Sequence, residues 1–346
     1  MAVVRGVSTE LPKNAYSKHD IAKVGATWLR EQSYERELFE RFVSSSQISQ
    51  RYFALTLDQI LALGGPRERA VLFQSEGRPL LKAAIKQLLA RCSTSAEEID
   101  HLVFTSCSAP VIPSIDAGVV DDLELRRTIN RVPVYQHGCA GGVVGLALAS
   151  RLVKPNERAI VSSVELCSLV YQAGDLSGGN LVGSAIFGDG AAAVLLDGSG
   201  RGLRIVAAQS HLVPDSAFLM GYGIEDDGVH LRLDRTLPQA LSQQAPRFIR
   251  SFLAGHGLTS KDISWWLFHP GGVKVLAVFQ DALGIRRDQS CWAWDILERY
   301  GNMSSASILF VLDSFLQSGL AKSGDKVCML GVGPGLTIEA ILFEQD

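Results

Sequence analysis

The stretch VYQHGCAGGVVGLALAS, residues Val134–Ser150, predicts a strand end, a glycine-rich turn and an apolar helix. β-Branched and aromatic residues before the turn favour a strand, and the apolar run after it has the length of a helix. Cys139 therefore lies at a strand-to-helix turn, where the glycines permit close approach of a ligand to the backbone. A thiol at a helix N-terminus faces free N–H groups and the positive end of the helix dipole, which lowers its pKa and favours a nucleophilic thiolate. The alternative is a buried structural cysteine, because cysteine is among the most buried residue types.

The order of elements around this stretch recurs later in the chain. Four pairs of segments correspond in order: 100–110 with 262–272, 135–153 with 298–316, 157–165 with 324–335, and 190–198 with 336–346. A repeated alternation of helix and strand predicts an α/β fold built from two duplicated halves, which we place at residues 1–200 and 201–346. The alternative is a chance likeness between two ordinary α/β halves.

The repeat also aligns polar residues. Cys139 and Asn302 occupy matching turns, each before an apolar helix, and His269 matches the strand end near Cys107. We therefore expect a cysteine, a histidine and an asparagine to converge where the two halves meet.

Composition and charge exclude several classes of protein. The 346 residues carry a net charge of −3, without the basic cluster that nucleic acids or membrane surfaces attract. No apolar run approaches the ~18–20 residues that span a bilayer, and the N-terminal residues lack the pattern of a signal peptide. The six cysteines form no CxxC pair and have no histidine at metal-ligand spacing, so we expect neither a metal site nor a disulfide framework. These features predict a protein of the reducing cytoplasm.

The order Cys139, His269, Asn302 also fits a papain-like cysteine protease. The gap from the cysteine to the histidine is 269 − 139 = 130 residues, which lies within the range of that family. The local context differs, because papain-like enzymes carry a C-G-[SA]-C-[WY] motif near the mature N-terminus and this chain has Gly138-Cys139-Ala140-Gly141. The spacing alone does not distinguish a protease from another enzyme with these three residues. The residues around Cys139 argue against the protease.

Five motifs together resemble the type III polyketide synthases, the chalcone synthase-like branch of the thiolase superfamily. They are HGCAGG, LFHPGG, YGNMSS, LVGSAIFGDGAAA and GVGPGLTIEAILF, and the likeness runs from Arg51 to the C-terminus. The resemblance implies a thiolase fold of five layers, αβαβα, and a homodimer. It also implies iterative decarboxylative condensation of malonyl-CoA onto an acyl starter, with coenzyme A thioesters as substrates and no further cofactor.

The resemblance assigns catalytic roles to three residues. Cys139 would hold the starter as a thioester, because sulfur is both a good nucleophile and a good leaving group. His269 would keep this thiol as a thiolate by imidazolium pairing. His269 and Asn302 would then stabilise the enolate oxygen that forms when malonyl thioester loses CO₂, as an oxyanion hole does. The alternatives are a core histidine and a helix-capping asparagine.

Further residues carry over from the resemblance as substrate contacts. Phe187 matches a gatekeeper phenylalanine between the coenzyme tunnel and the cavity, with a plain core phenylalanine as the alternative. The expected cavity-lining residues are Cys107, Ile112, Cys167, Gly183, Leu231, Ser304 and Pro334. Arg41 matches one member of a basic cluster for the coenzyme A phosphates, and Lys274 is a second candidate, with a solvated lysine as the alternative.

The segment VELCSLVYQAGDLSGGNLVG, residues 164–183, is more similar to bacterial alkylpyrone and alkylresorcinol synthases than to plant enzymes. This similarity implies a medium or long fatty acyl starter and a pyrone or resorcinol-type product. The starter would arrive on coenzyme A or on an acyl carrier protein. The alternatives are a ketoacyl synthase III-like enzyme that makes one condensation, although its C-terminal loop resembles GGG where this chain has Gly333-Pro334-Gly335, and a thiolase-fold partner subunit without activity.

Overall fold

Nine strands form one mixed sheet in the computed structural model, which describes residues 2–226 and 228–346. In spatial order the strands are β11 (Trp265–Phe268), β12 (Lys326–Gly333), β13 (Thr337–Gln345), β8 (Leu203–Leu212), β1 (Val3–Glu10), β7 (Asp189–Asp197), β6 (Arg158–Leu166), β4 (His101–Ser106) and β5 (Asn130–Tyr135). Most of these strands are apolar on both faces, as expected for strands that are covered by helices on both sides.

The sheet repeats one arrangement on either side of its middle. From the middle outward, β1, β7, β6 and β4 follow one another on one side, and β8, β13, β12 and β11 on the other. In both series the successive pairs are antiparallel, antiparallel and parallel. The two series join only where β1 pairs with β8, through Val3↔Arg204 and Val4↔Leu203. This repetition confirms the predicted α/β fold with two duplicated halves, while the boundary at residue 200 stays a prediction.

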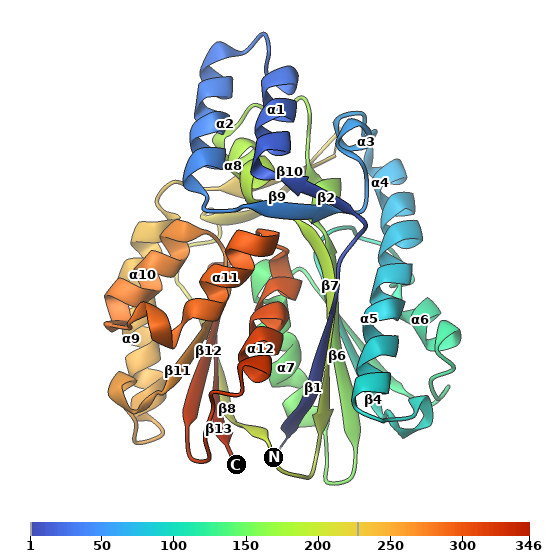
Figure 1. The fold of residues 1–346 in the computed structure, drawn as a ribbon, viewed down its shortest axis with the longest axis vertical. Coiled ribbons are helices and arrows are strands. Elements are labelled where there is room, and N and C mark those ends of the chain that lie inside the picture. The colour runs from blue at the N-terminus through green and yellow to red at the C-terminus, as the bar shows by residue number, and fades with distance from the viewer. Residues whose placement is uncertain (1, 227) are drawn as a thin grey trace.

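Helices complete the five layers (Figure 1). The helices α7 (Gly141–Leu152) and α12 (Ser307–Ser318) lie between the two half-sheets, and each packs against strands of both halves. The outer layer of the first half contains α5 (Arg78–Arg91), and that of the second half contains α9 (Leu237–Ala254) and α10 (Val273–Leu283). The order αβαβα agrees with the thiolase fold expected from the sequence.

Glycines let the two central helices approach each other closely. A Cβ atom on Gly142, in the first turn of α7, would lie 2.4 Å from the carbonyl oxygen of Ser305. A Cβ atom on Gly145 would lie 3.0 Å from Thr105 of β4 and 2.9 Å from Val161 of β6. The glycines of the quoted stretch therefore bring the turn before α7 against the turn before α12.

A cap of shorter elements covers one end of the sheet, at the top of Figure 1. It begins with α1 (Lys18–Trp28) and α2 (Ser33–Ser45), which are separated where Leu29 to Gln32 end the first helix. The other helices and strands of the chain, in the cap and outside it, are β2 (Asn14–Ser17), β3 (Gln50–Phe53), α3 (Leu57–Leu61), α4 (Pro66–Leu72), α6 (Asp116–Asp122), α8 (Gly178–Ile186), β9 (Met220–Glu225), β10 (Gly228–Leu233) and α11 (Cys291–Tyr300). The sequence analysis had not identified α8 or the β9–β10 hairpin, and both carry residues of the site. No helix in the described ranges has the length and hydropathy to cross a membrane.

Candidate active site

Cys139 lies in a short 3₁₀ turn, Gly138–Ala140, directly before α7. Gly138 has a φ of +50°, and a Cβ atom there would lie 2.6 Å from Cδ of Pro334. The turn therefore needs glycine for its backbone and for its contact with the 333–335 loop. Pro334 lies against the nucleophile turn, and its contact with substrate stays a prediction.

Asn302 occupies the matching turn of the second half, just before the 3₁₀ turn Ser304–Ala306 that leads into α12. Its Oδ1 accepts a hydrogen bond of 2.8 Å from the backbone N–H of Ser304, and its Nδ2 donates one of 3.4 Å to the carbonyl oxygen of Gly271. The side chains of Asn302 and Ser304 also lie near the thiol of Cys139 and favour its ionised form, which lowers its pKa. Asn302 therefore connects the nucleophile with the turn that follows His269.

His269 directly follows β11 and is only 2% exposed. Its backbone N–H donates to the carbonyl oxygen of Leu330 at 2.8 Å, which anchors the strand end. Within the described residues, neither ring nitrogen has a hydrogen-bond partner. Burial lowers the pKa of His269 to about 3, so the ring is neutral at physiological pH. A neutral imidazole without a partner can donate one hydrogen bond and accept another.

The sequence analysis expected a lowered pKa at Cys139, and the structure corrects this. Burial raises the pKa of the thiol to about 11, and the side chains of Ser304 and Asn302 only partly oppose this rise. The nearby Glu165 carboxylate raises it further. Desolvation therefore outweighs the helix N-terminus, and the prediction of a thiolate in the resting protein is wrong.

Glu165, the penultimate residue of β6, is a functional-site residue that the sequence analysis missed. It is 0% exposed and accepts hydrogen bonds from Cys107 N at 3.1 Å and from Ser305 N at 3.4 Å. The hydroxyls of Ser106, Ser108 and Ser305 also donate to it. Burial raises its pKa, and these hydrogen bonds oppose the rise. A single carboxylate at the end of an otherwise apolar strand was the signal available in the sequence, because a buried charge must be paired or hydrogen-bonded.

Cys107 extends this polar cluster toward the nucleophile. Its Sγ lies 3.3 Å from Oγ of Ser304 and 3.9 Å from Oη of Tyr222. Tyr222 comes from β9, so the missed hairpin supplies a wall of the site. Both Cys107 and Ser304 were expected to line the cavity, and the structure brings them together beside Cys139.

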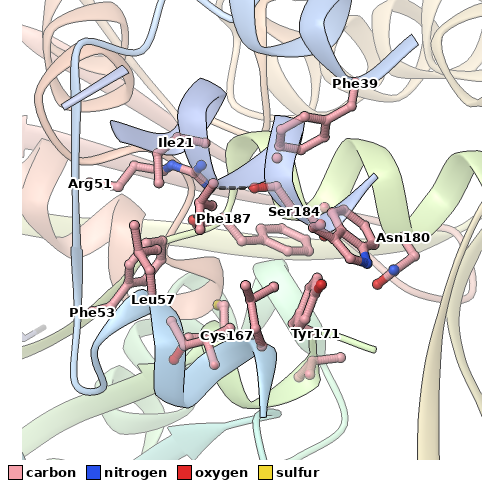
Figure 2. A pocket seen from close by; sticks show the side chains of 18 of the residues that line it. Ile21, Phe39, Arg51, Phe53, Leu57, Cys167, Tyr171, Asn180, Ser184 and Phe187 are labelled. Carbon is pink, nitrogen blue, oxygen red and sulfur yellow. Dashed lines mark hydrogen bonds between the residues drawn. The ribbon is translucent and has the colours of Figure 1, made fainter. Parts of the chain in front are cut away.

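An apolar pocket of about 650 Å³ of empty space, part of it open to solvent, lies under the N-terminal helices (Figure 2). Four of the expected cavity residues line it: Cys167, Gly183, Phe187 and Leu231. The opposite walls include Ile21, Val24, Gly25 and Trp28 of α1 and Phe39 of α2. A Cβ atom on Gly183 would lie 2.6 Å from Leu231 and 3.2 Å from the ring of Phe187, so the glycine leaves room for both side chains. Phe187 therefore forms part of the wall of an apolar pocket.

Three expected substrate contacts lie elsewhere. Ile112 is 98% exposed in the single chain, and its place in the cavity stays a prediction. It follows the loop after β4 and points away from the core because Ala109 and Ile115 take the buried positions on either side. Arg41 on α2 and Lys274 on α10 are exposed side chains, and their role in coenzyme A binding stays a prediction.

In the described part of the chain, no group of three or more histidine, cysteine, aspartate or glutamate residues has the arrangement of a metal site. The polar cluster around Glu165 is instead satisfied by hydroxyl, thiol and backbone donors.

Two family models match nearly the whole chain. Residues 1–200 match the N-terminal domain of chalcone and stilbene synthases, and residues 204–345 match their C-terminal domain. A 1,3,6,8-tetrahydroxynaphthalene synthase from Streptomyces peucetius subsp. caesius is 35% identical, over 98% of this chain and 92% of the relative. An alpha-pyrone synthesis polyketide synthase-like protein of Mycobacterium tuberculosis is 30% identical, over 99% of this chain and 91% of that protein.

Solved structures show the same likeness. The crystal structure of 1,3,6,8-tetrahydroxynaphthalene synthase from Streptomyces coelicolor A3(2), described as a bacterial type III polyketide synthase, has a TM-score of 0.95 and 25% sequence identity. The match covers 99% of both chains. These matches set aside the protease and ketoacyl synthase III alternatives.

Proposed function

The chain belongs to the chalcone and stilbene synthases, the type III polyketide synthases, and from this premise we propose that it loads an acyl starter onto Cys139 and extends it with malonyl-CoA. The observation that carries the proposal is the position of Asn302. Its side chain lies near the Cys139 thiol and donates a hydrogen bond of 3.4 Å to the carbonyl of Gly271, two residues after His269. An acyl group on the sulfur would therefore lie next to the donors that its condensation requires.

Loading transfers the acyl group from one thioester to another. The Cys139 sulfur attacks the starter carbonyl carbon, a new carbon–sulfur bond forms, and the thiol of the carrier leaves. Because burial raises the pKa of Cys139, the thiol gives up its proton only as attack proceeds, and the neutral ring of His269 is the group proposed to accept it. The departing thiolate takes that proton back.

Extension begins when malonyl-CoA loses CO₂ and leaves an enolate. Negative charge then develops on the thioester oxygen, and hydrogen bonds from His269 and from Nδ2 of Asn302 would stabilise it. The neutral state of His269 suits this role, since a neutral ring keeps one N–H donor. No general base is required, because loss of CO₂ itself generates the carbon nucleophile. The reaction needs no cofactor beyond the coenzyme A thioesters.

A medium or long acyl starter is the favoured substrate class. Apolar side chains of α1 and α2 form one wall of the pocket beyond Phe187. Cys167 forms part of the opposite wall. Each buried methylene of an acyl chain contributes roughly 0.8 kcal/mol. This pocket supports a pyrone or resorcinol-type product from such a starter.

A malonyl starter is the second candidate. The relative at 35% identity is named for 1,3,6,8-tetrahydroxynaphthalene, whose ten ring carbons correspond to five two-carbon units. The polar wall made by Tyr222, Cys107 and Ser304 suits a short, oxygen-rich chain. The two candidates therefore differ in the part of the site that holds the growing chain. A long acyl starter would occupy the apolar pocket beyond Phe187, and a malonyl starter would lie against the polar wall.

We also propose that the protein is a cytoplasmic homodimer. The exposed Ile112 supports the dimer, because an apolar side chain that is 98% exposed in one copy loses contact with water when a second copy packs on it. Delivery of the starter on coenzyme A or on an acyl carrier protein leads to the same thioester on Cys139.

Product mass spectrometry tests the proposal. Purified protein is incubated with malonyl-CoA alone and with malonyl-CoA plus acyl-CoA starters of graded chain length. Products that carry the long acyl chain support the favoured starter, and a product made from malonyl-CoA alone supports the second candidate. Absence of both condensation and malonyl-CoA decarboxylation would contradict the proposed function.

A further inference from the structure

Two buried charges lie beside the Phe187 gate, outside the catalytic set. Arg51, in β3, is 3% exposed, and Asp189, the first residue of β7, is 1% exposed. Burial of a charge is unfavourable unless the charge is paired and hydrogen-bonded. The contacts of these two residues therefore indicate what they do.

Arg51 holds the C-terminal end of α8. Its Nη1 donates to the carbonyl oxygens of Ser184 at 2.7 Å and Phe187 at 2.8 Å (Figure 2). These carbonyls lie at the end of the helix, where backbone oxygens lack a helical partner and the dipole favours a cation. The guanidinium thus fixes the backbone of the gate residue itself.

The backbone of the gate is paired with the backbone of Asn302. Residues Phe187 and Asn302 form a parallel bridge, in which Asn302 N donates to Ile186 O at 2.8 Å and Gly188 N donates to Asn302 O at 3.0 Å. The aliphatic part of Arg51 packs on the same turn, since a Cβ atom on Gly301 would lie 3.1 Å from its Cγ and Cδ. A shift of the Phe187 carbonyl would therefore move the segment that orients Asn302.

Asp189 anchors the other side of this segment. Its carboxylate accepts hydrogen bonds from Ser168 N at 2.8 Å, Ser168 Oγ at 2.6 Å and Ala54 N at 2.9 Å. Ser168 adjoins Cys167 of the pocket wall, and Ala54 follows β3. The negative charge of Asp189 also favours the charged form of Arg51. Arg51 and Asp189 thus connect β3 and the residue after it with the segment that contains Phe187.

We propose that Arg51 is a positioning residue of the condensation: it holds Phe187 and, through the paired backbone, sets the orientation of the Asn302 carboxamide, while Asp189 balances its charge. The proposal rests on the proposed function, because it concerns the oxyanion donor of malonyl-CoA decarboxylation. Arg51 also lines the apolar pocket, but it makes no hydrogen bond to the thiol of Cys139 among the described residues. Its effect reaches the reaction only through Asn302.

The test measures malonyl-CoA decarboxylation, as formation of acetyl-CoA, in Arg51→Met, Arg51→Lys and Asp189→Asn. Misplacement of a catalytic group by about 1 Å costs on the order of 10²-fold, so Arg51→Met should lower kcat by about 10- to 100-fold with KM unchanged. Arg51→Lys keeps a cation that can reach the carbonyls and should recover part of this loss. Acylation of Cys139, followed by intact mass, should persist in all three variants.

A matched control separates positioning from general destabilisation. Arg91, on α5, donates to the carbonyl of Val7 and to the carboxylate of Asp313, and so contacts neither Phe187 nor Asn302 through these hydrogen bonds. Arg91→Met should lower the melting temperature without lowering kcat. An equal loss of kcat in both arginine variants would overturn the proposal.

A double-mutant cycle with Asn302→Ala is the decisive measurement. If Arg51 acts through Asn302, then Arg51→Met should cost little in the Asn302→Ala background, because the oriented donor is already absent. Losses that multiply, or a raised KM with unchanged kcat, would show that Arg51 acts independently or binds substrate. Should Arg51→Met fail to fold, the same cycle is run with Arg51→Lys. A wild-type protein without decarboxylation would refute the proposed function, whereas an active wild type without this coupling refutes only the role of Arg51.

Discussion

The strand ends after β4 and β11 occupy equivalent places in the two halves, yet they differ in hydrogen bonding. The polar groups after β4 have partners, and the ring nitrogens after β11 have none among the described residues. After β4, Cys107 joins a cluster in which the carboxylate of Glu165 accepts hydrogen bonds at both of its oxygens. After β11, both ring nitrogens of His269 lack a partner among the described residues. Both sites are buried, so the difference comes from the partners and not from exposure to water.

This difference separates structural polar groups from reactive ones. Buried polar groups are almost always hydrogen-bonded, and an exception in a functional site has bonding capacity in reserve for a substrate. The Glu165 cluster holds the first half against Ser305 of the second half and stabilises the fold. The ring of His269 keeps its hydrogen-bonding capacity for the reaction. The predictions below test this separation, beginning with the largest effect.

Cys139→Ser tests the reactive side most strongly. Serine keeps the shape of the turn but lacks the nucleophilic sulfur, so polyketide formation should fall by on the order of 10⁴-fold or more. Malonyl-CoA decarboxylation, which uses His269 and Asn302, should partly survive. Peptide mapping after reaction with labelled starter checks the site, with Cys92→Ser as the control. Label on a cysteine peptide that lacks Cys139 would contradict the assignment.

Asn302→Ala removes one oxyanion donor. Loss of such a donor costs on the order of 10²–10³ in rate, so decarboxylation should fall by that factor while acylation of Cys139 continues. Assays of CO₂ release and of intact protein mass separate the two steps. The exposed Asn156 supplies a control, Asn156→Ala. Condensation at near wild-type rate would show that Asn302 serves only as a cap.

Cys167→Phe tests whether the pocket holds the starter. A phenyl ring would fill the space beside Cys167, and overfilling a packed site is unfavourable. The variant should lose long starters and keep short ones, because each methylene excluded from the pocket costs roughly 0.8 kcal/mol. The measurement is kcat/KM across a series of acyl-CoA lengths. Cys167→Ala should retain the wild-type profile, and an unchanged profile in the phenylalanine variant would place the starter elsewhere.

Glu165→Gln tests the structural side. The amide keeps the volume of the carboxylate but replaces one of its two acceptor oxygens by an NH₂ group, which then faces either the Ser108 or the Ser305 hydroxyl, both of which donate to Glu165. The free energy of unfolding should fall by about 1–3 kcal/mol, the usual cost of unsatisfied buried polar groups. Urea denaturation measures the change against Glu31→Gln, because Glu31 is exposed. Equal stability of the two variants would show that the cluster contributes little to the fold.

The smallest expected effect is an absence of pH dependence. Burial lowers the pKa of His269 to about 3, so the ring stays neutral as the pH falls through 6.5, where an ordinary histidine gains a proton. In Cys139→Ser, where no thiol titrates beside it, decarboxylation should be constant between about pH 5 and 8. A rate that falls with a pKa near 6.5 would indicate a solvated His269 and would remove the contrast with Glu165.

Sequence patterns alone were sufficient for the fold class, the duplicated order of elements and the turns of Cys139 and Asn302. These features depend on local signals: glycines at a strand-to-helix turn, apolar runs of helical length, and strands that end in polar residues. The family motifs then pointed to His269 and Phe187, and the gatekeeper role of Phe187 stays a prediction. The α8 helix was missed because its glycine-rich sequence, GGNLVGSAI, has weak helix propensity, and tertiary packing of its apolar face supplies the stability instead.

The tertiary structure decided which groups share an environment. The sequence shows Cys139 at a helix N-terminus but not the depth of its burial, and burial raised its pKa where the local motif predicted a lower one. Glu165, Tyr222 and Arg51 reached the site from separate strands, through contacts between residues more than 50 positions apart in the chain. Desolvation and hydrogen bonding depend on all neighbours in space, whereas sequence patterns report neighbours along the chain. The sequence by itself therefore determined which nucleophilic and polar groups the chain contains. Only the packing of the two halves decided which of these polar groups are hydrogen-bonded and which are left to react.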